Sequence, residues 1–268
     1  MTHYRRSKPH VTPVLAFAVI AAASSFSPAT WAQDNADNAV YSFAGTATGV
    51  ENQEAIYTED HQVTGSCVNN VFQPLERQVT YRRADEAKTE LATKTMRYEQ
   101  SPQRPSYTFD QPNVGEKINV RNEDDKQLRI NADMGENDKK TFELALNDQI
   151  VVDAGFLSLI RQHWHALNAG EEVSFEFLSP TRGKTYDFIA EPVSDSRIDV
   201  ALAIKIRPAG MFLNWLVDPV LLGFDDEGQL TDYIGLSNIR KNSESNYVVH
   251  LQYQSADLPC ALISPKQP

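Results

Sequence analysis

The stretch Asp153–Gly170, DAGFLSLIRQHWHALNAG, predicts the one long helix of the chain, while most other segments alternate as strands do. Asp153 is a suitable N-cap because its carboxylate can accept hydrogen bonds from the free N–H groups of the first turn. Val152 and Leu157 occupy the positions of a hydrophobic staple, and Gly170 suits the left-handed residue that ends a helix. Apolar residues at helical spacing define one stripe: Phe156, Ile160, Trp164 and Leu167. This stripe needs an apolar surface, and a β-sheet is the surface that the rest of the chain offers.

Segments on both sides of this helix alternate between apolar and polar residues with the period of two that half-buried strands show. The most regular alternation covers 197–207, where Ile198, Val200 and Leu202 begin one apolar face. The proline-containing segment 101–113 is expected at a sheet edge or as a crossing, because proline cannot donate to a ladder. About a dozen such strands predict one large antiparallel sheet that is curled or barrel-like. The predicted fold is mainly β, with one main α-helix at about 153–169 packed on this sheet.

The first 32 residues have the order of a secretory signal peptide. Arg5, Arg6 and Lys8 precede the apolar run Val14–Ala23, and a small-x-small cleavage site ends at Ala32. An uncleaved membrane anchor is the alternative, although the apolar run is shorter than the ~20 residues that a membrane span needs. We expect export, to the periplasm or further to the medium, with no transmembrane span after cleavage. The remaining chain is then a disordered leader over 33–38 and a single β-rich domain over 39–268.

The chain is acidic, with 36 Asp and Glu residues against 25 Lys and Arg residues. The predicted signal contains three of the basic residues and none of the acidic ones, which leaves 22 basic and 36 acidic residues after it. An acidic surface repels phosphate groups. The composition therefore argues against nucleic acid and anionic membrane surfaces as partners, and it indicates no oligomeric state.

Cys67 and Cys260 are the two cysteines of the chain. In an exported protein a pair of cysteines predicts a disulfide, and two buried free thiols are the alternative. The bridge would tie an early loop to the C-terminal tail. Closing so long a loop predicts a stabilisation of ~4–5 kcal/mol from chain entropy, less any strain in the native state.

Pro208–Leu222, PAGMFLNWLVDPVLL, is the other concentrated apolar stretch. Met211, Phe212, Trp215 and Leu216 stand at helical spacing within it. One interpretation is a short helix that covers the core. The other is a lip over an apolar cavity, in which these four residues bind an apolar or lipid-like small molecule.

Glu59, His61 and Arg161 are the residues from which a catalytic site could be built. Strand alternation places Glu59 and His61 on one face, where a carboxylate and an imidazole could share acid–base chemistry. His163 and His165 point apart in the predicted helix, so they cannot share a metal ion. The sequence has no zinc-protease, nucleophile-elbow, P-loop or dinucleotide-binding motif. We expect no metal site and no cofactor.

The helix and the strand after it resemble a pattern of uncharacterised exported proteins of Gram-negative bacteria, a domain of unknown function with the motif GF-x3-IR-x2-W-x2-L-x2-G followed by F-x-F-x2-P-x-R. The matching residues are Gly155, Phe156, Ile160, Arg161, Trp164, Leu167, Gly170, Phe175, Phe177, Pro180 and Arg182. Further residues resemble parts of the same pattern: Tyr57, Glu59, His61, Tyr81, Arg82, Tyr233, Gly235, Ser237 and Asn238. The resemblance covers most of the chain after the predicted signal. It implies no activity, and it implies a curled β-sheet similar to periplasmic lipid-carrier folds by analogy alone.

Together these patterns predict an exported envelope protein that holds an apolar or lipid-like ligand without catalysing a reaction. The first alternative is a hydrolase acting on cell-envelope material, with Glu59, His61 and Arg161 around a shared cleft. The second is a protein-interaction or assembly module, whose signature would be a large exposed apolar patch.

Overall fold

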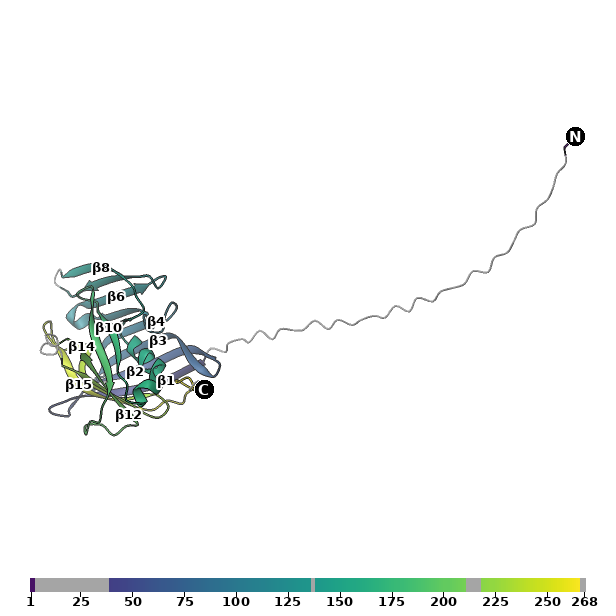
Figure 1. Cartoon of the computed structure of the whole chain (residues 1–268). Coiled ribbons are helices and arrows are strands. Elements are labelled where there is room, and N and C mark those ends of the chain that lie inside the picture. The colour runs from purple at the N-terminus through teal and green to yellow at the C-terminus, as the bar shows by residue number, and fades with distance from the viewer. Residues whose placement is uncertain (3–38, 136–137, 211–217, 266–268) are drawn as a thin grey trace. The chain divides into compact units, whose positions relative to one another are not determined.

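A computed structural model describes residues 1–2, 39–135, 138–210 and 218–265 of the chain (Figure 1). Within these residues, 15 strands form one sheet in the order β8-β7-β6-β5-β4-β3-β2-β1-β15-β14-β13-β12-β11-β10-β9. The predicted fold class, mainly β with one large curled sheet, is confirmed. The predicted signal peptide and leader fall almost wholly outside the described residues, and they stay predictions.

Two antiparallel meanders build this sheet. The first contains β1 (Ala39–Gly49), β2 (Ala55–Val68), β3 (Val71–Arg83), β4 (Glu90–Arg97), β5 (Ser106–Gln111), β6 (Glu116–Asn122), β7 (Gln127–Asp133) and β8 (Lys139–Ala145). The second contains β10 (Val173–Ser179), β11 (Lys184–Pro192), β12 (Leu202–Pro208), β13 (Val220–Phe224), β14 (Leu230–Arg240) and β15 (Asn246–Tyr253). They become one sheet because β15 pairs antiparallel with β1.

The link between the meanders carries β9 (Ile150–Val151), α1 (Gly155–Gln162) and α2 (Trp164–Asn168). It leads from β8 at one end of the strand order to β9 at the other, where β9 pairs in parallel with β10. The sheet curls far enough to bring its two ends near each other, because the Phe142 ring of β8 packs on the backbone of Gly183 in the β10–β11 turn. The described strands β8 and β9 are not paired by backbone hydrogen bonds, so the sheet is curled and not closed by a ladder.

The helices pack on the inner face of the second meander. The apolar stripe of the predicted helix is largely buried there: Ile160, Trp164 and Leu167 join the cluster that includes β10 and β12, and Phe156 is half-buried at its edge. The Trp164 indole meets the Phe224 ring edge-on, with 5.9 Å between the ring centroids. The predicted packing of the helix on a curled sheet is confirmed.

The N-cap prediction for Asp153 is wrong. Helix α1 begins at Gly155, its N-cap is Ala154, and no side chain caps it. The Asp153 carboxylate instead accepts hydrogen bonds from the buried Lys94 ammonium, with 2.8 Å between Nζ and Oδ2. A buried cation needs a counter-charge more than a helix needs a cap. Because the helix starts later, Val152 is buried in the core but does not occupy the staple position.

The predicted single helix is also interrupted once. His163 separates α1 from α2, so the segment is two short helices. The predicted end is confirmed, since Gly170 has a left-handed φ of 92° just after α2. The Glu171 N–H donates to the Ala166 carbonyl at 3.0 Å, as in the motif by which glycine ends many helices.

Two strand predictions are wrong. Strand β5 lies between β4 and β6 rather than at an edge. Its flanking prolines stay out of the ladder, because Pro105 precedes the strand and Pro112 begins the short 3-10 helix η1 (Pro112–Val114) after it. Strand β12 begins only at Leu202, since Asp195 turns the chain before it by accepting hydrogen bonds from both the backbone and the side chain of Arg197.

Gly155 marks the closest approach of α1 to the loop before β5. A methyl group on Gly155 would lie 2.0 Å from the Gln103 carbonyl oxygen, which also accepts the Val152 N–H. Because backbone atoms would have to move, we expect Gly155→Ala to lower the free energy of unfolding by about 1–3 kcal/mol, measured by urea denaturation.

Gly210→Ala is the matched control, because no described atom lies within 4 Å of the added methyl group. We expect it to change the free energy of unfolding by less than about 0.5 kcal/mol. If the two variants were equally stable, α1 would not be held against Gln103 as described.

Candidate functional site

Glu59 and His61 lie in contact inside the sheet, as strand alternation predicts. The His61 Nε2 is 2.8 Å from the Glu59 Oε2, and the two side chains are 2% and 8% exposed. Arg77 of β3 donates to His61 Nδ1 through Nε at 3.2 Å and through a terminal nitrogen at 2.9 Å. The Tyr253 hydroxyl of β15 donates to the same Glu59 oxygen at 2.9 Å. We call these four residues the polar seam.

Gly45 of β1 allows the polar seam to cross the sheet. It pairs with Glu59 of β2 on one side and with Tyr253 of β15 on the other. A methyl group on Gly45 would lie 2.7 Å from the Tyr253 ring. Since no side chain blocks the way, the ring passes over β1 to reach Glu59. Phe43, two residues earlier, stacks on the His61 ring with 4.4 Å between centroids.

Burial and the neighbouring charges determine the protonation of the polar seam. Burial first, and then the Arg77 charge, lower the pKa of His61 from 6.5 to about 4. The imidazole is therefore neutral at neutral pH, with one donor and one acceptor. Its Nε2–H donates to Glu59, and its Nδ1 accepts from Arg77. Burial alone would raise the pKa of Glu59, but the hydrogen bonds from His61 and Tyr253 and the charge of Arg77 outweigh it and lower that pKa.

This arrangement leaves His61 little room to act on a substrate. A general base needs a free lone pair within hydrogen-bond reach of the substrate proton, and both nitrogens of His61 are engaged inside the sheet. Arg161, the third predicted catalytic residue, lines a pocket that Arg77 also reaches, and it forms no hydrogen bond to Glu59 or His61 in the described structure. The structure thus brings two of the three residues together and leaves the third apart. Their catalytic role stays a prediction.

Lys94 and Asp153 form an ion pair in the interior, next to the polar seam in the order of the strands. The sequence did not predict this pair, and it did not predict the roles of Arg77 and Tyr253 in the polar seam. The Lys94 Nζ lies 2.8 and 3.0 Å from the two Asp153 carboxylate oxygens and 5.4 Å from the centroid of the Phe109 ring. Strand alternation indicated the inward position of both cations, because each lies two residues from at least one buried apolar neighbour in its own strand. These neighbours are Val79 for Arg77, and Ala92 and Met96 for Lys94.

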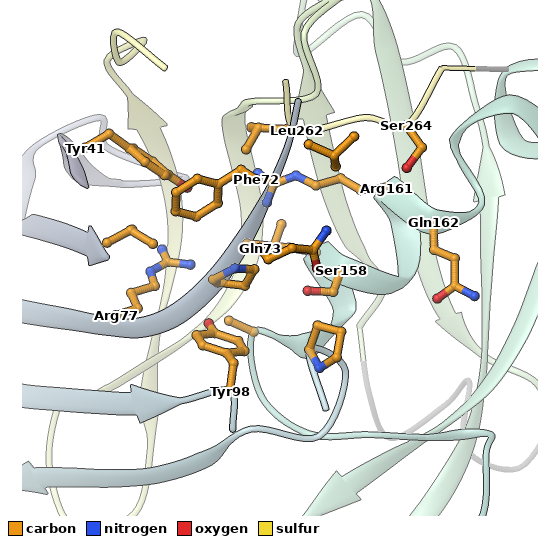
Figure 2. A pocket seen from close by; sticks show the side chains of 16 residues that line it. Tyr41, Phe72, Gln73, Arg77, Tyr98, Ser158, Arg161, Gln162, Leu262 and Ser264 are labelled. Atoms are coloured by element: carbon orange, nitrogen blue, oxygen red, sulfur yellow. The ribbon is translucent and has the colours of Figure 1, made fainter. Parts of the chain in front are cut away.

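A pocket of about 220 Å³ opens between α1 and strands β1 to β3 (Figure 2). The tail after β15 forms part of its wall through Leu262 and Ser264. The disulfide between Cys67 and Cys260 holds this tail against β2, so the predicted disulfide is confirmed. A backbone bridge between Val71 and Ala261 holds it against β3.

Arg77 and Arg161 reach this pocket from β3 and α1 (Figure 2). The Arg161 Nε donates to the Gly228 carbonyl at 3.0 Å, which anchors the side chain. Burial, together with repulsion from Arg77, lowers the pKa of Arg161. Apolar side chains complete much of the wall: Tyr41, Phe72, Leu157 and Leu262. The pocket therefore combines apolar walls with two guanidinium groups.

Met211, Phe212, Trp215 and Leu216, the predicted ligand-binding residues, lie outside the described residues. Their contact with a ligand stays a prediction. In the described ranges, no helix is both long and apolar enough to cross a membrane. No three His, Cys, Asp or Glu side chains gather as a metal site in the same ranges.

The fold and the site define a protein with a curled β-sheet, a helical link on its inner face and a small pocket beside that link. Among solved structures, the chain is similar to a β-barrel-like protein of a domain of unknown function, DUF1849, from Brucella abortus. The match has a TM-score of 0.45 and 7% sequence identity, and it covers 82% of this chain and 97% of that chain. No protein-family model matches the sequence, and no curated protein matches it. The predicted residue pattern and the Gram-negative origin stay predictions.

The lowered pKa of His61 predicts how stability depends on pH. The folded pKa of about 4 lies below the ordinary 6.5, so below pH 6.5 the unfolded chain binds a proton that the folded chain does not. The contribution of His61 is therefore complete above pH 6.5 and is lost as pH falls towards 4. We expect the gap in unfolding free energy between the wild type and His61→Gln to shrink by about 2–3 kcal/mol between pH 7 and pH 4.5.

Urea denaturation at both pH values measures this gap. His165→Gln is the control, since His165 is exposed and its variant should follow the wild type at both pH values. A gap for His61→Gln that is the same at pH 7 and pH 4.5 would mean that His61 titrates alike in the folded and unfolded chains.

Proposed function

We propose that this protein is a non-enzymatic envelope protein whose pocket beside α1 holds the apolar part of a lipid-like small molecule. The observation that carries the proposal is the pocket of about 220 Å³ with walls formed by Tyr41, Phe72, Leu157 and Leu262. A dry apolar cavity of about 150 Å³ already binds benzene. Typical ligand sites have ~300–1,000 Å³. The pocket therefore suits one end of an amphiphile, with the remainder extending outward.

The residues that form the walls of the pocket belong to well-packed parts of the structure, which favours binding of a ligand. Leu157 belongs to α1, whose neighbours Leu159 and Ile160 are buried in the core of the second meander. Phe72 and Leu262 belong to a small cluster with Cys260, which the disulfide joins to β2. A site whose walls are already ordered loses little conformational entropy when a ligand enters.

Export to the periplasm is part of the proposal. The basic, apolar and small-residue order of the first 32 residues supports it. The disulfide between Cys67 and Cys260 also supports it, because disulfides persist in oxidising compartments such as the periplasm.

The two alternatives have less support. A hydrolase would need His61 to reach substrate, and its nitrogens are already engaged by Glu59 and Arg77. An assembly module would need a large exposed apolar patch. In the described chain, Leu236 and Val248 are exposed opposite each other on β14 and β15, which makes one cross-strand pair. The other large apolar side chains exposed after Met1 lie on three more strands and one turn: Val40, Val50, Val68 and Leu75.

Displacement of an apolar fluorescent probe tests the proposal. We expect Nile red to bind the wild type and to be displaced by a lipid extract of the cell envelope. Ser158 lines the pocket from α1, so Ser158→Trp should fill it and reduce probe binding at least about tenfold, because the indole takes the ligand's place.

Ser174→Trp is the matched control, since Ser174 is exposed on β10 away from the pocket, and its variant should bind the probe as the wild type does. Thermal melting checks that both variants are folded. Unchanged binding by folded Ser158→Trp, or no binding by the wild type, would contradict the proposal.

A further inference from the structure

The residues that line the pocket differ in charge from the rest of the chain. The chain has 36 acidic and 25 basic residues. The 16 residues around the pocket nevertheless contain no Asp or Glu among the described residues, and they contain two arginines, Arg77 and Arg161. An acidic protein thus presents a pocket of mixed polar and apolar walls whose only charged side chains, in the described structure, are cations.

The two cations are not equivalent. The positive charge of Arg77 is compensated within the polar seam. The neutral His61 ring lies between Arg77 and the Glu59 carboxylate and forms hydrogen bonds with both. Arg161 has no carboxylate within ion-pair distance in the described chain. Asp225 is the acidic residue whose charge acts on Arg161, but the Asp225 carboxylate accepts hydrogen bonds from the backbone N–H groups of Glu227 and Gln229 instead. Among the described residues that line it, the pocket therefore carries positive charge and no negative charge at neutral pH.

The hydrogen-bond donors at the pocket indicate which chemical group of a ligand would fit beside Arg161. A guanidinium has five N–H donors in a planar fork that fits carboxylate and phosphate oxygens. Among the described residues, Arg161 uses only Nε, for the Gly228 carbonyl. Ser158, one helical turn before Gln162 and three residues before Arg161, brings a hydroxyl to the same pocket. An uncompensated cation in a half-buried pocket is costly unless an anion completes it.

We propose that Arg161, supported by Arg77 and Ser158, binds the anionic head of an amphiphile, a carboxylate or a phosphate monoester, while Tyr41, Phe72 and Leu157 contact its hydrocarbon part. This inference rests on the proposed function and names the class of ligand. The small size of the pocket fits it, because a site of about 220 Å³ accommodates a head group with a short length of chain. Charge-assisted hydrogen bonds to the guanidinium make the head group the source of specificity.

Four probes of equal chain length test the inference: octanoate, octyl phosphate, octanol and octylamine. Their affinities for the full chain are measured by calorimetry and by displacement of Nile red. We expect octanoate, octyl phosphate or both to bind at least about tenfold more tightly than octanol, since hydrogen bonds to charged groups supply that much. Octylamine should bind more weakly than octanol. The ratio between octanoate and octyl phosphate identifies the head group.

Variants at Arg161 assign the effect to this residue. Arg161→Met should remove the preference for the anion, so that octanoate and octyl phosphate bind no more tightly than octanol, while octanol binding changes less than about twofold. Arg161→Gln, which keeps a donor for the Gly228 carbonyl, gives the same test if the Met variant does not fold. Arg121→Met is the control, because Arg121 is exposed on β6 and should leave all four affinities unchanged.

Equal binding of octanoate, octyl phosphate and octanol by the wild type would overturn the head-group site and leave the proposed function standing. Binding of none of the four would overturn both. Acetate or inorganic phosphate binding as tightly as the octyl derivatives would also overturn the inference, because the apolar walls would then contribute nothing to the ligand.

Discussion

The antiparallel pairing of β1 with β15 is the interaction on which the rest of the structure depends. It joins residues that are about two hundred positions apart, with Gly45 opposite Tyr253 and Gly49 opposite Val249. Closing so long a loop costs roughly 5 kcal/mol in chain entropy. The disulfide between Cys67 and Cys260, which spans 193 positions, offsets a similar free energy, ~5 kcal/mol, because it lowers the conformational entropy of the unfolded chain. Without this pairing the two meanders would be separate sheets.

The polar seam and the pocket are both consequences of that pairing. Tyr253 reaches Glu59 only because β15 lies beside β1 and Gly45 leaves the path open. The tail that follows β15 then lies beside the first residues of β3, where Leu262 forms part of the pocket wall. Buried charges in such an interior are tolerated when each has a partner. Arg77 and Lys94 have theirs in the described chain, and Arg161 is the exception that gives the pocket its chemical character.

Local pattern was a good guide wherever a segment has one polar and one apolar face. It located the sheet, the helical link, the glycine that ends it and the adjacency of Glu59 and His61. It failed where a tertiary partner competed with a local one. Asp153 pairs with Lys94 and does not cap the helix. The regular alternation before Leu202 is not a strand there, and Asp195 stabilises a turn in that segment. The prolines around β5 also misled, because they flank the ladder rather than interrupt it.

The sequence by itself determined the period of the strands, the position of the helical link and the pairing of the only two cysteines, because these depend on near neighbours or on simple counting. Strand order, the partners of the buried charges and the place of Arg161 were decided only by the tertiary structure. Alternation states which face of a strand is buried but not which strand lies beside it. A charged residue at an inward position is therefore visible in the sequence, whereas its partner, drawn from β15 or the helical link, is fixed only when the sheet curls and brings them together.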